Sequence, residues 1–95
     1  MQNTGRTPAD YTKLKEELEK QKWPRPYMFK FIVPNSQESI KQVSMLFVNP
    51  KAKITTHVSK TGKYCSITIV EAMKNPESVI NRYKQAEGIP NLMSL

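Results

Sequence analysis

Residues 51–73 read KAKITTHVSKTGKYCSITIVEAM, and this stretch decides the fold because it contains two strands and the turn that joins them. β-branched and aromatic residues alternate with polar ones on both sides of a short polar segment, as in a hairpin with one buried face. Gly62 stands between the strands, where a tight turn needs a residue that adopts positive φ without strain. The stretch therefore predicts a β-hairpin.

The apolar residues of this hairpin set the pairing of its strands. If helices cover one face of the sheet, these residues must point to that face; they are Ile54, Val58, Cys65, Ile67 and Ile69. Because opposed residues share a face, Val58 must pair with an odd-numbered residue, which leaves a loop of two or four residues. The other face then carries Lys51, Lys53, Thr55, His57, Ser59, Tyr64, Ser66, Thr68 and Val70.

An amphipathic helix precedes the sheet. Tyr11, Leu14 and Leu18 recur at spacings of three and four residues among charged residues, which predicts a helix over residues 10–22. The two prolines of the WPRP segment end this helix, because proline cannot continue it. We expect residues 1–9 to form a disordered tail.

Residues 27–33, YMFKFIV, predict the first strand of the sheet. Successive side chains of a strand point to opposite faces, so we expect one set in the core and the other on the opposite face. The core set is Tyr27, Phe29, Phe31 and Val33, and the opposite set is Met28, Lys30 and Ile32.

Two further helices flank the hairpin. Ser36 is suited to cap the first, and Pro76 stands near the first turn of the second. Pro50 ends the first helix and Gly88 the second. Residues 89–95, IPNLMSL, predict a short final strand. The apolar stripes are Ile40, Val43, Leu46 and Phe47 in the first helix and Val79, Ile80, Tyr83 and Ala86 in the second.

The expected element order is a helix followed by β-α-β-β-α-β. Two right-handed βαβ halves in this order form a four-stranded antiparallel sheet with both later helices on one face. We expect an α+β fold of this kind, the ferredoxin-like sandwich, with the N-terminal helix as an addition. A chain of 95 residues suits a single domain, which we place at residues 10–95.

The composition limits the classes of function. No apolar run approaches the roughly 20 residues needed to cross a bilayer, and the N-terminus lacks the apolar core of a secretory signal. We therefore expect a cytoplasmic protein without a membrane partner. Cys65 is the single cysteine, which excludes an internal disulfide and a multi-cysteine metal site. We expect neither a metal nor a cofactor.

Most of the positive excess behind the net charge of +7 lies after residue 25, and the hairpin is its basic feature. Between Pro50 and Val70 the chain has four lysines, one histidine and no acidic residue. Such a patch can attract nucleic acid or another anionic partner, although lysines on a hairpin are more often a solvated surface that resists aggregation. The lysines are Lys51, Lys53, Lys60 and Lys63.

Three segments resemble the YbeD-like family of small bacterial proteins: SKTGKYCSITI, the upstream WPRPYMFKF and the short apolar C-terminal strand. The resemblance covers about residues 14–95. His57 and Val58 depart from the family pattern, which often has Arg or Lys at the first position and Pro at the second. The residues that carry the resemblance are Phe29, Lys30, Ser59, Gly62, Tyr64 and Ser66.

The resemblance implies a ferredoxin-like, ACT-domain-like fold and a regulatory protein of the bacterial cytoplasm, which is sometimes labelled as related to lipoate. ACT-like domains commonly pair through sheets or helices and bind small effectors at the interface. The resemblance therefore implies a protein partner or a homodimer, with a small anionic ligand as a further candidate.

Five residues on the expected open face of the sheet form the candidate binding site: Lys30, His57, Ser59, Tyr64 and Ser66. In this hypothesis Lys30 and His57 attract an anionic group. Tyr64 supplies an apolar wall with a hydroxyl, and the two serines orient the ligand. A simpler interpretation is that Tyr64 and Ser66 only support the hairpin, and that the N-terminal helix covers the open face.

We do not expect catalysis. A nucleophilic serine needs a histidine and an orienting carboxylate, and the nearest acidic residue to the hairpin lysines is Glu71. The loop VPNSQES has neither the glycine and arginine that an acyl-phosphate hydrolase would use nor the paired cysteines of a metal chaperone. The sequence therefore favours a non-catalytic binding or regulatory module.

Binding of RNA or DNA is the alternative function. Proteins of the RRM kind stack bases on aromatic residues of the open face of such a sheet, while lysines contact phosphates. Phe29 and Phe31 are expected to fill the core, which leaves Tyr64 as the only aromatic residue on the expected open face. A nucleic-acid interface is therefore the weaker of the two expectations.

Overall fold

The structure of the chain is a computed structural model, and it describes residues 11–95. The expected tail at residues 1–9 and the first residue of the expected N-terminal helix lie outside the described residues. The elements in order are α1 (Tyr11–Glu19), β1 (Arg25–Pro34), α2 (Gln37–Ser44), β2 (Lys53–Val58), β3 (Tyr64–Met73), α3 (Pro76–Ala86) and β4 (Met93–Ser94).

The described residues form an α+β structure with a four-stranded antiparallel sheet and three helices. The strand order is β2-β3-β1-β4, so β1 and β3 are central and β2 and β4 are the edges. This arrangement is compatible with a ferredoxin-like fold.

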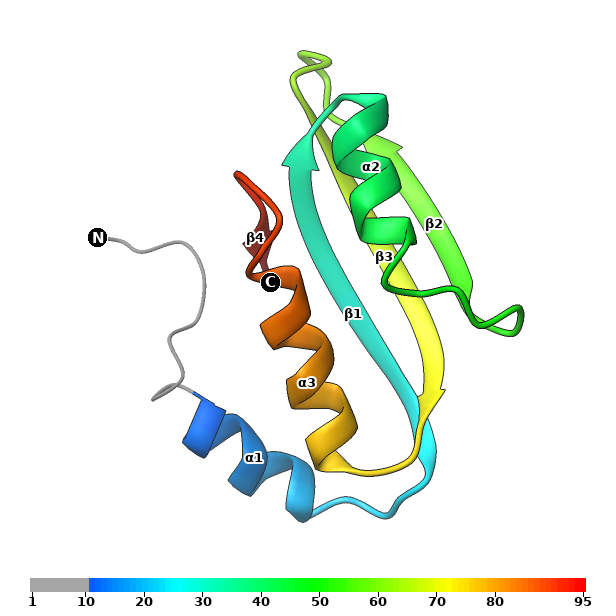
Figure 1. Cartoon of the computed structure of the whole chain (residues 1–95), viewed down its shortest axis with the longest axis vertical. Helices are drawn as coiled ribbons and strands as arrows, with labels where there is room; N and C mark the ends of the chain where they lie inside the picture. Colours follow the sequence, from blue (N-terminus) through cyan, green and yellow to red (C-terminus); the bar gives the residue numbers. More distant parts are fainter. Residues whose placement is uncertain (1–10) are drawn as a thin grey trace.

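The helices lie in one layer. In Figure 1, α2 and α3 both lie in front of the sheet, and α1 lies beside α3 rather than across the sheet. The ring of Tyr11 in α1 stacks on that of Tyr83 in α3, with 6.4 Å between their centroids. The interpretation that the N-terminal helix covers the open face is therefore wrong, because α1 buries its apolar side against α3.

The core lies between the sheet and the helices, and its main residues are those that the alternation predicts. Phe29, Phe31 and Val33 of β1 have no exposed surface, and Cys65, Ile67 and Ile69 of β3 are at most 1% exposed. Tyr83 of α3 packs on Phe29, with 5.3 Å between the ring centroids. The expected apolar side of α3 is likewise buried.

Two helices end earlier than the sequence predicts. α1 ends at Glu19 rather than residue 22, and the indole Nε1 of Trp23 donates a hydrogen bond of 2.8 Å to the carbonyl of Leu18 near that end. α2 begins after the expected cap, Ser36, but ends at Ser44, because tighter turns follow it. These turns bring Phe47 onto Phe29, with 5.0 Å between the ring centroids.

The final strand is shorter than expected. β4 consists of Met93 and Ser94, which pair with β1, while Ile89 and Leu92 of the same predicted strand pack into the core instead. Asn91 between them has a φ of 61°, a left-handed conformation that breaks the extended chain before β4.

Candidate functional site

The hairpin has the register that its apolar residues predict. Val58 pairs with the odd-numbered Cys65, and the amide of Ser59 donates a hydrogen bond of 2.9 Å to the carbonyl of Tyr64. Between these last two residues lies a loop of four residues, Lys60–Lys63, in which Gly62 has the positive φ of 76° that the turn requires.

The apolar residues of β2 are more exposed than those of β3. Ile54 and Val58 share the face of the buried β3 residues, as expected, but they are 40% and 48% exposed. All six residues of β2 are exposed. The reason is that β2 is an edge strand: among the elements of residues 11–95, α2 packs mainly against β1 and α3 against β3 rather than against this edge.

The turn of the hairpin is fastened to the end of β1. The amide of Asn35 donates to the carbonyl of Lys63 at 2.9 Å, and its side-chain Nδ2 donates to the carbonyl of Gly62 at 3.0 Å. This role of Asn35 does not follow from the sequence, because only the paired strands bring residues 35 and 62 together. The contacts fix the position of the loop lysines beside the sheet.

Four of the five candidate residues meet around one shallow hollow on the open face. His57, Ser59, Tyr64 and Ser66 line a space of about 100 Å³ together with Ile32 of β1. Ile32 of β1 is opposite Ser66 of β3, and Ser66 is opposite His57 of β2. These three residues form a row across three strands, and this row is the floor of the hollow. The sequence placed Ile32 on this face but not in the site.

Lys30 is not part of the hollow. It pairs with Thr68, and Thr68 pairs with Thr55, so Lys30 lies on the adjacent row of the open face. Its side chain is exposed. Lys30 therefore contributes positive charge beside the hollow rather than a contact inside it.

The two serines hold the hairpin together. The hydroxyl of Ser59 accepts a hydrogen bond of 3.2 Å from the amide of Tyr64, and the hydroxyl of Ser66 lies 3.4 Å from the carbonyl of His57, to which it donates. These bonds support a structural role for the serines, while His57 and Tyr64 present their side chains to solvent.

Tyr64 also borders a second hollow, of about 380 Å³, on the β4 side. Its other lining residues are Pro34, Lys63, Asn91 and Met93. This hollow does not follow from the sequence, because it depends on the left-handed turn at Asn91 and on the pairing of β4 with β1. With an exposed fraction of 53%, Tyr64 stands between the two hollows.

The open face combines exposed apolar side chains with positive charge. Met28 is 59% exposed, and Met93 and Leu95, which lie beside β1, are 40% and 55% exposed. No aspartate or glutamate lies on this face within the described residues. The basic residues on or beside it are Lys30, Lys53, His57 and Lys63, and Lys51 and Lys60 extend the exposed basic surface of the hairpin.

The nearest carboxylate in sequence faces the other way. Glu71 is 7% exposed on the helix-covered side, where its Oε1 lies 3.2 Å from the Nη1 of Arg82 on α3. The guanidinium of Arg82 in turn lies over the ring of Phe47, 4.7 Å from its centroid. Glu71 is therefore part of the core packing and does not approach His57.

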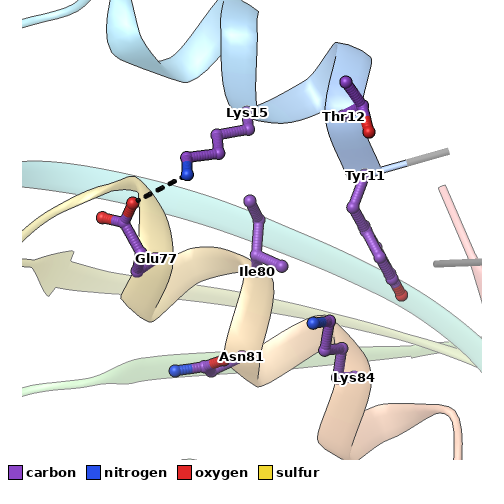
Figure 2. Close-up of a pocket in the computed structure, with 7 residues that line it drawn as sticks. All are labelled: Tyr11, Thr12, Lys15, Glu77, Ile80, Asn81 and Lys84. Carbon is purple, nitrogen blue, oxygen red and sulfur yellow. Dashed lines mark ion pairs between the residues drawn. The ribbon is translucent and has the colours of Figure 1, made fainter. Parts of the chain in front are cut away.

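A groove between α1 and α3 is a further hollow with polar lining (Figure 2). It holds about 230 Å³ and is lined by Tyr11, Thr12, Lys15, Glu77, Ile80, Asn81 and Lys84. Lys15 reaches across it to Glu77, with 3.2 Å between the Nζ and Oε2 atoms. The hydroxyl of Tyr11 donates to the carboxylate of Glu87. These two polar contacts thus join α1 to α3.

The position of Glu77 at the start of α3 shifts the pKa of its carboxyl. Its pKa lies below the ordinary 4.5, first because its backbone hydrogen bond at the start of α3 favours the carboxylate, and then because Lys15 does. Burial acts weakly in the opposite sense.

Within residues 11–95, no three side chains of His, Cys, Asp or Glu gather as metal ligands would. None of the described helices has both the length and the apolar character that a membrane span requires. Comparison of the chain with family models, with curated proteins and with solved structures found no match in any of the three.

Proposed function

We propose that this chain is a non-catalytic regulatory module that binds a segment of a partner protein on the open face of its sheet. The partner segment has apolar side chains interspersed with acidic ones. We place this module in the cytoplasm, in the ferredoxin-like fold class and in the YbeD-like family that residues 14–95 resemble.

One observation carries this proposal: the open face is apolar and basic at once. A sheet face that only meets water is usually polar, whereas Met28, Tyr64, Met93 and Leu95 are each at least 40% exposed on or beside this one. Lys30 and His57 lie among them. Burial of these apolar groups would favour a partner, and the unopposed positive charges would select acidic side chains on it.

The smaller of the two hollows beside Tyr64 favours a side chain of a protein over a small molecule. Pockets that enclose small ligands usually hold about 300–1,000 Å³. The hollow lined by His57 and Ser66 holds about 100 Å³, room for one apolar side chain. Tyr64, amphipathic and central, is the residue type that dominates such contacts.

Nucleic acid remains the second candidate because of the basic hairpin. Its lysines are exposed, but Phe29 and Phe31 are wholly buried, so Tyr64 is the one aromatic residue that the open face presents within the described chain. Single-stranded RNA would then bind through phosphates, and its affinity would fall steeply as salt is added. Absence of RNA binding at low salt would remove this candidate.

Affinity capture followed by a binding measurement on the purified partner tests the proposal. The test variant is Lys30→Ala with Tyr64→Ala. The matched control, Lys41→Ala with Met45→Ala, removes a lysine and a large exposed apolar residue from the α2 side. The partner's affinity should fall about tenfold or more in the test variant and stay unchanged in the control. Equal affinity of the partner for both variants and the wild type would show that the open face is not the binding surface.

A further inference from the structure

We propose that the partner segment places an aromatic side chain in the larger hollow beside Tyr64 and an acidic side chain next to it, against Lys63. This hollow is the one of about 380 Å³ on the β4 side. Because the segment binds the open face, the site rests on the proposed function and makes it specific. The face would recognise an aromatic residue flanked by aspartate or glutamate.

The larger hollow lies where strand pairing holds three parts of the chain together. Its lining residues come from the end of β1, the start of β3 and the segment that leads into β4: Pro34, Lys63, Tyr64, Asn91 and Met93. Met93 pairs with Ile32, and the amide of Leu95 donates a hydrogen bond of 2.9 Å to the carbonyl of Lys30. The walls of the hollow are therefore fixed by the sheet itself.

The walls of the larger hollow suit an aromatic ring. The ring of Tyr64 can pair with a second ring edge to face, and the thioether of Met93 makes favourable contacts with aromatic rings. Tyr64 and Met93 are 53% and 40% exposed, so both have surface left to bury. A small aliphatic side chain would leave the hollow partly empty and would forgo contacts with its walls.

The exposure of these walls favours a side chain on a segment over a free small molecule. The volume lies within the range of about 300–1,000 Å³ that is usual for small-ligand pockets. Such pockets, however, cover about 70–90% of their ligand. Because Tyr64 and Met93 are themselves about half exposed, a free molecule here would stay largely in water. An aromatic side chain is instead held by the rest of its segment.

Lys63 supplies the charge that selects the flanking residue. It is exposed, and none of the ion pairs within residues 11–95 involves it. The hydrogen bonds that Asn35 donates to the carbonyls of Gly62 and Lys63 hold this part of the loop beside the hollow. A carboxylate next to the aromatic side chain would therefore meet a free ammonium group.

The smaller hollow continues the same binding surface. Met93 of the larger hollow is opposite Ile32, which lies in the floor of the smaller one, and Tyr64 borders both. One segment can thus place its aromatic side chain in the larger hollow and a smaller apolar side chain in the other.

Selection of peptides on the full chain tests the recognised chemistry. We expect a displayed library of random peptides to enrich tryptophan, phenylalanine or tyrosine beside aspartate or glutamate. The dissociation constant of an enriched peptide, measured by fluorescence polarisation, should rise about tenfold or more when its aromatic residue is changed to alanine. Enrichment of peptides that lack an aromatic residue, or no enrichment at all, would overturn the inference.

Two matched substitutions test the place of binding. Met93→Trp fills the hollow with a side chain of the chain itself, whereas Leu95→Trp adds the same bulk beside Lys30, outside the hollow. The dissociation constant of the enriched peptide should be about tenfold or more higher for Met93→Trp than for Leu95→Trp. Equal dissociation constants for the two variants would overturn the inference.

Charge reversal at Lys63 gives a gain of binding that a folding defect cannot produce. Lys63→Glu should bind the enriched peptide less tightly, and should prefer a version of it with lysine in place of the acidic residue. The control Lys51→Glu has the same net charge, but its substitution lies before the other end of β2, so it should keep the preference of the wild type. An unchanged preference in Lys63→Glu would contradict the assigned role of this lysine.

The captured partner separates failure of this site from failure of the proposed function. If Lys30→Ala with Tyr64→Ala weakens the partner while Met93→Trp does not, the open face is the binding surface but the larger hollow does not take an aromatic side chain. If neither variant weakens the partner, the proposed function fails as well. Weakening by both variants, with Leu95→Trp close to the wild type, is the result we expect.

Discussion

Tyr64 shows how much a single residue's position depends on its neighbours in the chain. Two features of the sequence place Tyr64 on the open face: side chains alternate along β3, and Val58 must pair with an odd-numbered residue. In the structure Tyr64 lies on that face and is 53% exposed. The second hollow beside it was not predictable, since Asn91 and Met93 reach Tyr64 only through a left-handed turn far along the sequence. Local patterns predict a residue's face, whereas its neighbours on that face require the tertiary fold.

The ion pair between Glu71 and Arg82 shows the same limit. In the sequence, Glu71 stands out only as the carboxylate nearest to the hairpin lysines. The structure pairs it with Arg82 of α3, and the guanidinium also lies over Phe47, a residue that enters the core because α2 ends early. Neither contact follows from spacing, because the three residues lie on different elements.

Arg82→Met should lower the free energy of unfolding by about 2–3 kcal/mol, because it leaves the buried carboxylate of Glu71 without its partner. Replacing both Glu71 and Arg82 by methionine should lower the free energy of unfolding less than Arg82→Met alone, since no uncompensated charge then remains. Urea denaturation of the single and double variants measures both quantities. Additive losses would mean that the pair does not exist in solution.

The elements were more predictable than their ends. The order of helices and strands follows from apolar periodicity and from the positions of Ser36, Gly62 and Pro76. The end of α2 at Ser44 does not follow from the sequence. The tight turns after Ser44 are stabilised by the burial of Phe47 rather than by local preference. The exposure of β2 also depends on which strands α2 and α3 cover.

The packing of α1 on α3 gives a prediction about acidity. The pKa of Glu77 is lowered by its own backbone hydrogen bond first and by Lys15 second. Lys15→Gln should therefore raise the pKa of Glu77 while leaving it below 4.5, as followed by NMR titration of the side-chain carboxyl. An unchanged pKa would mean that Lys15 does not pair with Glu77 in solution.

The sign of the resulting pH dependence follows from the same shift. Because the folded state lowers this pKa, Glu77 adds stability at pH values above its unfolded pKa, near 4.5. That contribution is lost as pH falls through the lower, folded pKa. In the Glu77→Gln variant, the free energy of unfolding should therefore fall less between pH 6 and pH 3 than in the wild type. Denaturation at both pH values would detect this difference.

At the scale of the whole molecule, the helices of residues 11–95 occupy one side of the sheet, and none of them covers the other side (Figure 1). All three helices contribute to this asymmetry, since α1 extends the layer beside α3 instead of crossing the sheet. The uncovered side and the outer edge of β2 are separate surfaces of the described chain.

Site-specific photo-cross-linking in cells tests the open face most directly. A photoreactive phenylalanine replaces Thr68, at the centre of that face, and in a matched variant it replaces Lys41 on the exposed side of α2. The account predicts a covalent adduct with a discrete protein at position 68 and none with that protein at position 41. The same adduct at both positions, or an adduct at position 41 alone, would contradict it.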